Sequence, residues 1–157
     1  MNKLISLTQG FFAIVDEQDY ESLSQFKWTV KINPTNTYAY RKDGGKTIHM
    51  HRVVLEAKHE EICDHINGNG IDNRRKNLRL CTMSQNMANS KLGAQNTSGY
   101  KGLLRRNGRW VARICFKTNG KKNSKWLGTF NTKRDAAIAY NTALRKIHGS
   151  YARLNKI

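Results

Sequence analysis

Short apolar segments separated by polar turns dominate the first 55 residues. Two strands are expected within residues 3–15, around a turn at 8–10, and a helix is expected over residues 17–26. We expect this helix region to direct Tyr20, Leu23 and either Phe26 or Trp28 toward a core. Three further runs alternate apolar and polar positions and predict an antiparallel meander: residues 28–32, 37–41 and 46–51.

Residues 62–90 combine short apolar ends with a long polar loop. Apolar positions mark one strand over about 62–66 and a second over about 78–80, and a short helix is expected after the second strand. The pattern therefore predicts a strand, a loop, a strand and a helix in succession. The residues that follow favour turns and have no periodicity, and we interpret 93–98 as a linker.

The last part of the chain predicts a sheet followed by a helix. Two hairpin turns, Asn107-Gly108 and Asn119-Gly120, separate three β-type runs. The helix begins after Asn131 or Thr132, repeats apolar residues every three or four positions and ends at Gly149. We predict an α+β protein with two domains: an antiparallel N-terminal domain that includes the strand–loop–strand–helix unit, over 1–92, and a three-stranded antiparallel sheet packed on one helix, over 99–157.

Charge changes this picture because it is unevenly distributed. The chain has 28 Lys and Arg against 11 Asp and Glu, a formal net charge of +17. Residues 93–157 alone hold 15 basic side chains and one acidic one, so they carry +14 of the excess. Such a segment predicts a polyanionic partner, and nucleic acid is favoured over a membrane surface because no basic helix has an aromatic apolar face.

Other features of composition point to a cytoplasmic protein. No apolar run is long enough to span a bilayer, and the first residues lack a signal-type apolar core, so we expect no membrane partner. Three cysteines without a C-x-x-C pair argue against a disulfide scaffold or a zinc ribbon. No obligate protein partner is evident either.

Four residues of the 62–90 unit are candidates for chemistry: Asp64, His65, Asn77 and Asn86. A histidine can accept a proton from water near neutral pH, and carboxylate and amide oxygens can hold a divalent ion that neutralises a phosphodiester transition state. An isolated Asp-His pair in a polar loop is usually a solvated turn, so the wider pattern decides. Adjacent strand residues point to opposite faces, and we therefore expect a strand end or bulge at Asp64 and His65.

This unit resembles the HNH endonucleases. The matching stretches are Cys63-Asp64-His65-Ile66-Asn67-Gly68, Asp72-Asn73-Arg74-Arg75, Asn77-Leu78-Arg79, and Thr82 with Gln85-Asn86, and His51-Arg52-Val53-Val54 looks like the lead-in of phage homing members. The resemblance implies a ββα-metal nuclease unit in which His65 is the general base, Asp64 and Asn86 hold one divalent metal ion, and Asn77 braces the loop. Asn86 stands where the founding pattern has histidine, which favours Mg²⁺ or Mn²⁺ over zinc.

Other polar residues near this unit have simpler interpretations. His51 is expected to form a local hydrogen bond, and His59 is expected to be exposed. Arg74 and Arg75 could belong to a solvated face, but beside a nuclease loop we expect them to contact DNA phosphates.

Residues 97–155 resemble the plant APETALA/ethylene-response-factor DNA-binding domain. The resemblance is carried by Ser98-Gly99-Tyr100-Lys101-Gly102, Gly108-Arg109-Trp110-Val111-Ala112, Trp126-Leu127-Gly128-Thr129-Phe130, Ala136-Ala137-Ile138-Ala139-Tyr140-Asn141 and Leu154-Asn155. It implies a sheet that reads the major groove, with DNA contacts from Lys101, Gly102, Arg106, Arg113, Trp126, Thr129 and Tyr140. Leu104, Asn107 and Arg113 depart from the plant pattern, and Trp126 could lie on the sheet surface or in the core.

Together these features predict an HNH homing-type endonuclease of a phage or mobile element. It would hydrolyse phosphodiester bonds of double-stranded DNA with Mg²⁺ or Mn²⁺, directed by its C-terminal module, in the cytoplasm of a bacterial or phage-infected cell. The alternative is a DNA-binding regulator whose nuclease-like unit is inactive. An RNA-binding module has less support, because no aromatic strand pair of the RNP type is present.

Overall fold

The computed structural model describes residues 1–118 and 120–157, and these form two compact units, Met1–Thr82 and Met83–Ile157. Helices and antiparallel sheets are present in both, which confirms the expected α+β class. Asn119, half of the second predicted hairpin turn, lies outside the described residues. Within the described part, no helix has the length and apolar run that crossing a bilayer requires.

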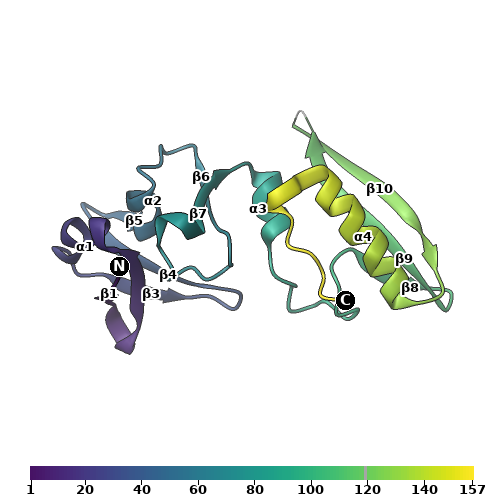
Figure 1. The fold of residues 1–157 in the computed structure, drawn as a ribbon, viewed down its shortest axis with the longest axis horizontal. Coiled ribbons are helices and arrows are strands. Elements are labelled where there is room, and N and C mark those ends of the chain that lie inside the picture. The colour runs from purple at the N-terminus through teal and green to yellow at the C-terminus, as the bar shows by residue number, and fades with distance from the viewer. Residues whose placement is uncertain (119) are drawn as a thin grey trace. The chain divides into compact units, whose positions relative to one another are not determined.

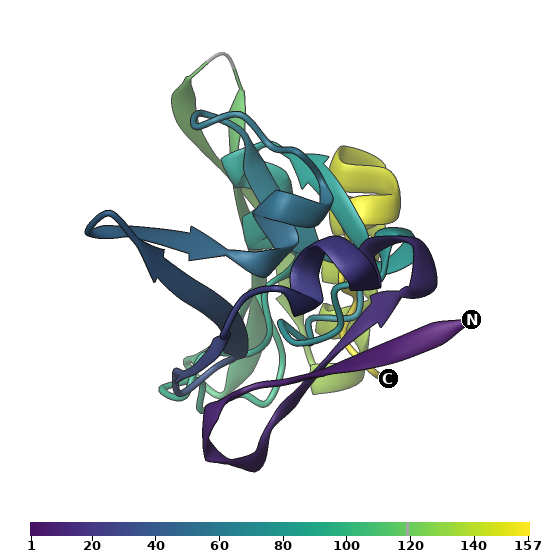
Figure 2. The same cartoon turned by 90° about the vertical axis from the view of Figure 1, so that its left-hand side faces the viewer.

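The first unit begins with two paired strands and a helix, followed by a three-stranded sheet. Figure 2 shows the purple ribbon formed by the first two strands, with the N-terminus at one end. The strands within both sheets pair antiparallel, and the second sheet has the order β3-β4-β5. The elements are β1 (Asn2–Ser6), η1 (Thr8–Gly10), β2 (Phe12–Asp16), α1 (Glu17–Ser24), β3 (Thr29–Ile32), β4 (Thr37–Asp43) and β5 (Lys46–His49).

Trp28 and Leu23 fill the core of this unit, as predicted, and the Trp28 indole donates a 2.8 Å hydrogen bond to the Leu23 carbonyl. Tyr20 and Phe26 are exposed instead. The prediction was wrong for Tyr20. Phe26 lies beyond the end of α1, where the Arg41 guanidinium stacks 4.1 Å from its ring centroid.

The strand–loop–strand part of the predicted unit completes the first unit. Its elements are α2 (Met50–Val54), β6 (Ile62–His65), η2 (Arg75–Asn77) and β7 (Leu78–Cys81). Two backbone hydrogen bonds attach the intervening loop to β2: Ile14 donates to Ile71 at 2.8 Å, and Asn73 donates to Ile14 at 2.7 Å. The loop is therefore held by the N-terminal strands.

The second unit is a sheet of order β10-β9-β8 packed on α4, as predicted (Figure 1). Thr132 caps α4, because its hydroxyl accepts from the Asp135 amide. Ala112 and Ala136 are fully buried, and their small side chains allow the helix to approach the sheet closely. The elements are α3 (Met83–Asn89), β8 (Leu103–Arg106), β9 (Arg109–Thr118), β10 (Lys121–Phe130), α4 (Lys133–His148) and η3 (Gly149–Tyr151).

Helix α3 is fixed to the rest of the second unit by Lys101. The Lys101 ammonium donates to the carbonyls of Ala88 (2.6 Å), Ser90 (3.0 Å) and Arg153 (3.2 Å). Burial, together with the Arg153 charge, lowers the pKa of Lys101 to about 8. The side chain thus closes the C-terminal end of α3, where helix carbonyls lack intrahelical partners.

Candidate active site

Strand β6 ends at His65, so the strand end that was expected at Asp64 and His65 is present. The imidazole is buried, and its Nε2 lies 3.2 Å from Asn73 Oδ1. An amide oxygen only accepts, so Nε2 carries the proton and the lone pair stays on Nδ1. Asn73 is fully buried, and its Nδ2 donates to Met50 Sδ at 3.4 Å. This second contact helps to fix the orientation of the side-chain amide.

The surroundings of His65 favour its neutral form. Burial lowers its pKa below 6.5, although the hydrogen bond to Asn73 and the charges of Asp64 and Asp72 act in the opposite direction. A neutral imidazole with its lone pair on Nδ1 has the form that a general base requires.

Aromatic rings surround this imidazole, and sequence reasoning missed this arrangement. The His51 ring contacts the His65 ring edge-on, with 5.0 Å between ring centroids, and stacks on the His49 ring at 5.3 Å. The centroid of the Tyr38 ring lies 5.9 Å from those of both His51 and His65. Burial lowers the pKa of His51 to about 3, and neighbouring positive charge acts in the same direction. The Nδ1 atoms of His49 and His51 are buried without a hydrogen-bond partner among the described residues. His49 also lies opposite Tyr40 on the neighbouring strand, and the centroids of these two rings are 6.3 Å apart.

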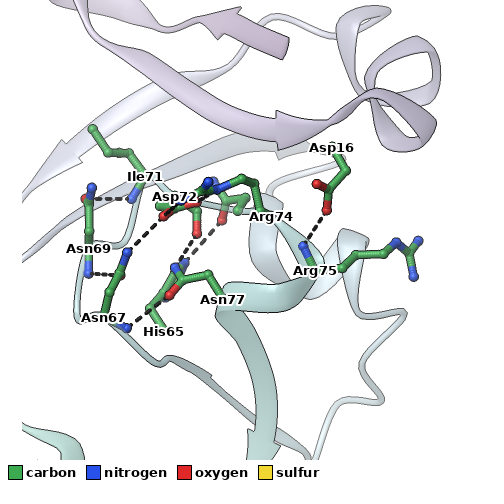
Figure 3. A network of polar contacts seen from close by, with 10 residues as sticks. Asp16, His65, Asn67, Asn69, Ile71, Asp72, Arg74, Arg75 and Asn77 are labelled. Carbon is green, nitrogen blue, oxygen red and sulfur yellow. Dashed lines mark hydrogen bonds and ion pairs between the residues drawn. The ribbon is translucent and has the colours of Figure 1, made fainter. Parts of the chain in front are cut away.

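Asn77 joins the two ends of the 66–77 loop, as Figure 3 shows. Its Oδ1 accepts from the Asn67 amide at 3.0 Å, and its Nδ2 donates to the Asp72 carbonyl at 2.7 Å. Its own carbonyl accepts from the Ile66 amide at 2.8 Å. These bonds fix the loop that carries Asn73, and through it the orientation of His65.

Arg74 and Arg75 both have carboxylate partners within the first unit. Arg74 forms two hydrogen bonds to the buried Asp72, at 2.7 and 2.6 Å. These hydrogen bonds lower the pKa of the Asp72 carboxyl group. Arg75 pairs with Asp19 at 2.7 Å, and its backbone amide donates to Asp16. Arg75 therefore helps to attach the loop to the rest of the first unit, whereas the Arg74–Asp72 pair lies within the loop (Figure 3).

Asp64 is a buried carboxylate directly opposite Arg79 in the β6–β7 pair. Its Oδ2 accepts from Arg79 Nε at 2.9 Å and lies 2.8 Å from Nη2. Asn86, the second predicted ligand, lies on α3 and is partly exposed. Among the described residues no group of three or more His, Cys, Asp or Glu side chains could hold a metal ion. Carboxylate and amide oxygens are hard donors, the type of ligand that Mg²⁺ or Mn²⁺ prefers.

Four of the predicted DNA-contacting residues share one face of the sheet in the second unit. Trp126 pairs with Arg113, and Arg106 pairs with Arg109, four residues before Arg113 on β9. Directly opposed residues share a face and alternate residues return to it, so Arg106, Arg113 and Trp126 lie together. Thr129 joins them, because a bulge between Trp126 and Gly128 shifts the register. Trp126 is 64% exposed and therefore belongs to the surface rather than to the core.

The other three residues of that set have roles in packing. Tyr140 is buried against the sheet, and a Cβ at Gly102, where φ is +73°, would overlap its ring. The Lys101 ammonium is occupied by the three carbonyls near the end of α3.

Comparison with known proteins agrees with both resemblances. Residues 49–88 match the HNH endonuclease family. Over 98% of its length the chain is 28% identical to an uncharacterized HNH endonuclease of Acanthamoeba polyphaga mimivirus, 80% of which is covered. It is 39% identical over 53% of its length to a dehydration-responsive element-binding protein of Arabidopsis thaliana, and 28% identical over 87% to an ethylene-responsive transcription factor of that plant. The chain spans 40% and 46% of the lengths of these two plant proteins. Both predicted resemblances are confirmed.

Proposed function

We propose that the protein is a metal-dependent endonuclease that hydrolyses phosphodiester bonds of double-stranded DNA. The observation that carries this proposal is the buried, neutral His65, whose Nε2 is held by Asn73 and which lies next to the Asp64 carboxylate. The match of residues 49–88 to HNH endonucleases supports the same chemistry.

His65 is the general base of this proposal. Its Nδ1 lone pair takes the proton of the attacking water, and the developing imidazolium keeps its Nε2–H on Asn73. Asp64 and Asn86 would hold Mg²⁺ or Mn²⁺, and that ion supplies positive charge to the phosphate and to the departing O3′. Asn77 keeps the loop closed, so the imidazole does not rotate away.

The exposed sheet face of the second unit is our candidate for DNA recognition. Arg113 and Trp126 lie side by side on it, and Arg106 and Thr129 extend it. Arginine can read guanine in the major groove, while the surrounding lysines supply contacts to phosphate. The names of the two plant relatives, a dehydration-responsive element-binding protein and an ethylene-responsive transcription factor, agree with this assignment.

The setting that we propose is a phage or mobile element whose homing-type enzyme acts on DNA in the cytoplasm of a bacterial or phage-infected cell. The viral relative and the lead-in His51-Arg52-Val53-Val54 support this setting.

The test is nicking of supercoiled plasmid by the purified full chain with Mg²⁺ or Mn²⁺. His65→Ala and Asp64→Ala should abolish nicking and leave the gel shift of a duplex close to wild type, because neither change touches the sheet face. Binding without any cleavage by the wild type would instead identify a regulator with an inactive nuclease-like unit. Nicking by His65→Ala at the wild-type rate would refute the assigned base.

A further inference from the structure

Arg113 differs in its partner from three arginines of the first unit. Arg41, Arg74 and Arg75 pair with carboxylates. Arg113 Nε instead donates to the hydroxyl of Ser124, with 2.6 Å between Nε and Oγ. Both residues are exposed, so packing against a core does not explain the contact.

The sheet explains why this hydroxyl lies within reach of Arg113. Trp126 on β10 is directly opposite Arg113 on β9, and Ser124 stands two residues before Trp126. Alternate residues of a strand return to the same face, so Ser124 is a diagonal neighbour of Arg113. Ala112 and Ile114, which flank Arg113 along β9, are buried on the other face. The contact therefore lies on the face that we assign to DNA recognition.

Ser124 holds the Arg113 guanidinium without neutralising it. The second unit contains a single acidic residue, Asp135, whose carboxylate accepts from the Thr132 hydroxyl at the start of α4. The Ser124 hydroxyl is neutral, so it fixes the position of the guanidinium but supplies no counter-charge. An arginine held in this way keeps its full attraction for an anionic or strongly accepting partner.

The bond to Ser124 also selects which donors of Arg113 remain. The planar guanidinium can present two parallel donors end-on, through Nη1 and Nη2, or side-on, through Nε and one Nη. Because Ser124 engages Nε, Arg113 keeps the end-on pair. Guanine offers two acceptors, O6 and N7, to such a pair in the major groove, whereas adenine offers one acceptor beside an amino donor.

We propose that Ser124 is a positioning residue that holds Arg113 for guanine, an inference that rests on the proposed recognition face. Ser124 fixes the guanidinium before DNA arrives, so Arg113 loses less side-chain freedom on binding. It also disfavours side-on contacts to phosphate, which would bind every sequence alike. The recognised partner is duplex DNA that presents a guanine to Arg113 in its major groove.

The test uses the full chain and a random duplex library, in EDTA so that no strand is cut. Selection by the wild type should return sites with a defined guanine, and Arg113→Ala should lose the preference at that guanine. Gel shifts then compare the selected duplex with one in which this G·C pair is replaced by A·T. We expect the wild type to discriminate about 5–150-fold, the value of a bidentate arginine–guanine contact. Ser124→Ala should reduce this discrimination about 2–10-fold, because Arg113 must then be ordered on binding.

Two further variants separate positioning from a general effect on the strand. Ser124→Thr keeps an Oγ and suits a strand, so it should retain the discrimination of the wild type. Asn123→Ala is the matched control, because Asn123 is the exposed neighbour of Ser124 and its side-chain amide donates to the Lys121 carbonyl at 3.1 Å. It should leave discrimination unchanged. The salt dependence of binding should be the same in all three variants, because none of them removes a charge.

A double variant distinguishes positioning from direct contact. Ser124→Ala should cost no further discrimination once Arg113 is replaced by alanine, because Ser124 acts through Arg113. A second loss in that background, or a loss at a different base pair, identifies a direct base contact by Ser124 and overturns the positioning role. Full discrimination in Ser124→Ala, with a guanine preference that does depend on Arg113, overturns it as well. A wild type without sequence preference, or a preference that Arg113→Ala leaves unchanged, overturns the recognition face and the role of Ser124 with it.

Discussion

Replacing Asn73 tests whether its amide sets the basic form of His65. Asn73→Ala removes the acceptor 3.2 Å from Nε2 and opens a small void at a fully buried position. Loss of one buried hydrogen bond costs about 1–3 kcal/mol, and each kcal/mol lowers the melting temperature of a unit of this size by roughly 4–8 °C. The imidazole then presents its Nδ1 lone pair to water for only part of the time. We expect kcat for nicking to fall about 10–100-fold, equivalent to about 1.4–2.8 kcal/mol.

Asn73→Asp separates the electrostatic effect from the packing effect. Burial lowers the pKa of His65, so the acid loss of wild-type activity should occur below pH 6.5. A carboxylate at position 73 would add to the negative charges of Asp64 and Asp72 and stabilise the imidazolium against the opposing effect of burial. The acid limb should then move upward by about one to three pH units.

The assay is the single-turnover nicking rate from pH 4.5 to 9 at saturating Mn²⁺, with thermal melting of each variant. Asn69→Ala is the control, because Asn69 lies in the same loop but is exposed and its side-chain amide makes only a 3.4 Å contact to the Ile71 amide. A folded Asn73→Ala that nicks at the wild-type rate, or an Asn73→Asp profile that coincides with the wild type, would refute the reasoning.

Three further expectations concern stability. The folded pKa of His51, about 3, lies below the unfolded value of 6.5, so the unfolded state binds the extra proton between these values and stability falls on acidification. Between pH 7 and pH 5, the free energy of unfolding should therefore fall by up to about 2 kcal/mol less in His51→Phe than in the wild type, as measured by urea titration. Equal decreases in the two proteins would contradict the assignment. Gly102→Ala should destabilise the second unit by more than about 2 kcal/mol through strain and overlap, and an unchanged melting temperature would contradict the packing. A fragment of residues 83–157 should melt above one of 96–157, because only the longer piece keeps two of the carbonyls that Lys101 contacts, and equal melting would argue against that role.

Local patterns in the sequence predicted the paired strands of the candidate site and the residues that the site presents. Asp64 and His65 could be found because their motif is contiguous. Asn73 could not, since a polar residue in a polar loop gives no sign that tertiary contacts will bury it completely. The partner of Arg75 was equally hidden, because Asp19 is 56 residues away in the chain.

The surface of the second unit shows a different limit. Alternation along one strand places its residues on a face, but it does not say how neighbouring strands are aligned. For that reason the sequence did not decide whether Trp126 lies on the sheet surface or in the core. The bulge between Trp126 and Gly128 also shifts the alternation, so the face on which Thr129 lies could not be predicted from it. Phe26 and Trp28 were alternatives for one core position, and Trp28 occupies it because α1 ends at Ser24, before Phe26.

The attachment of the site loop to β2 has a consequence for protein design. The span that matches the nuclease family, residues 49–88, omits Ile14, Asp16 and Asp19. Those residues hold the loop through two backbone hydrogen bonds and the contacts to Arg75. A minimal motif transplanted into a new scaffold would carry His65 and Asn73 without this support, and the loop would lose its fixed shape. A transferable nuclease module must therefore include the N-terminal strands, or a host strand that offers the same amide, carbonyl and carboxylates.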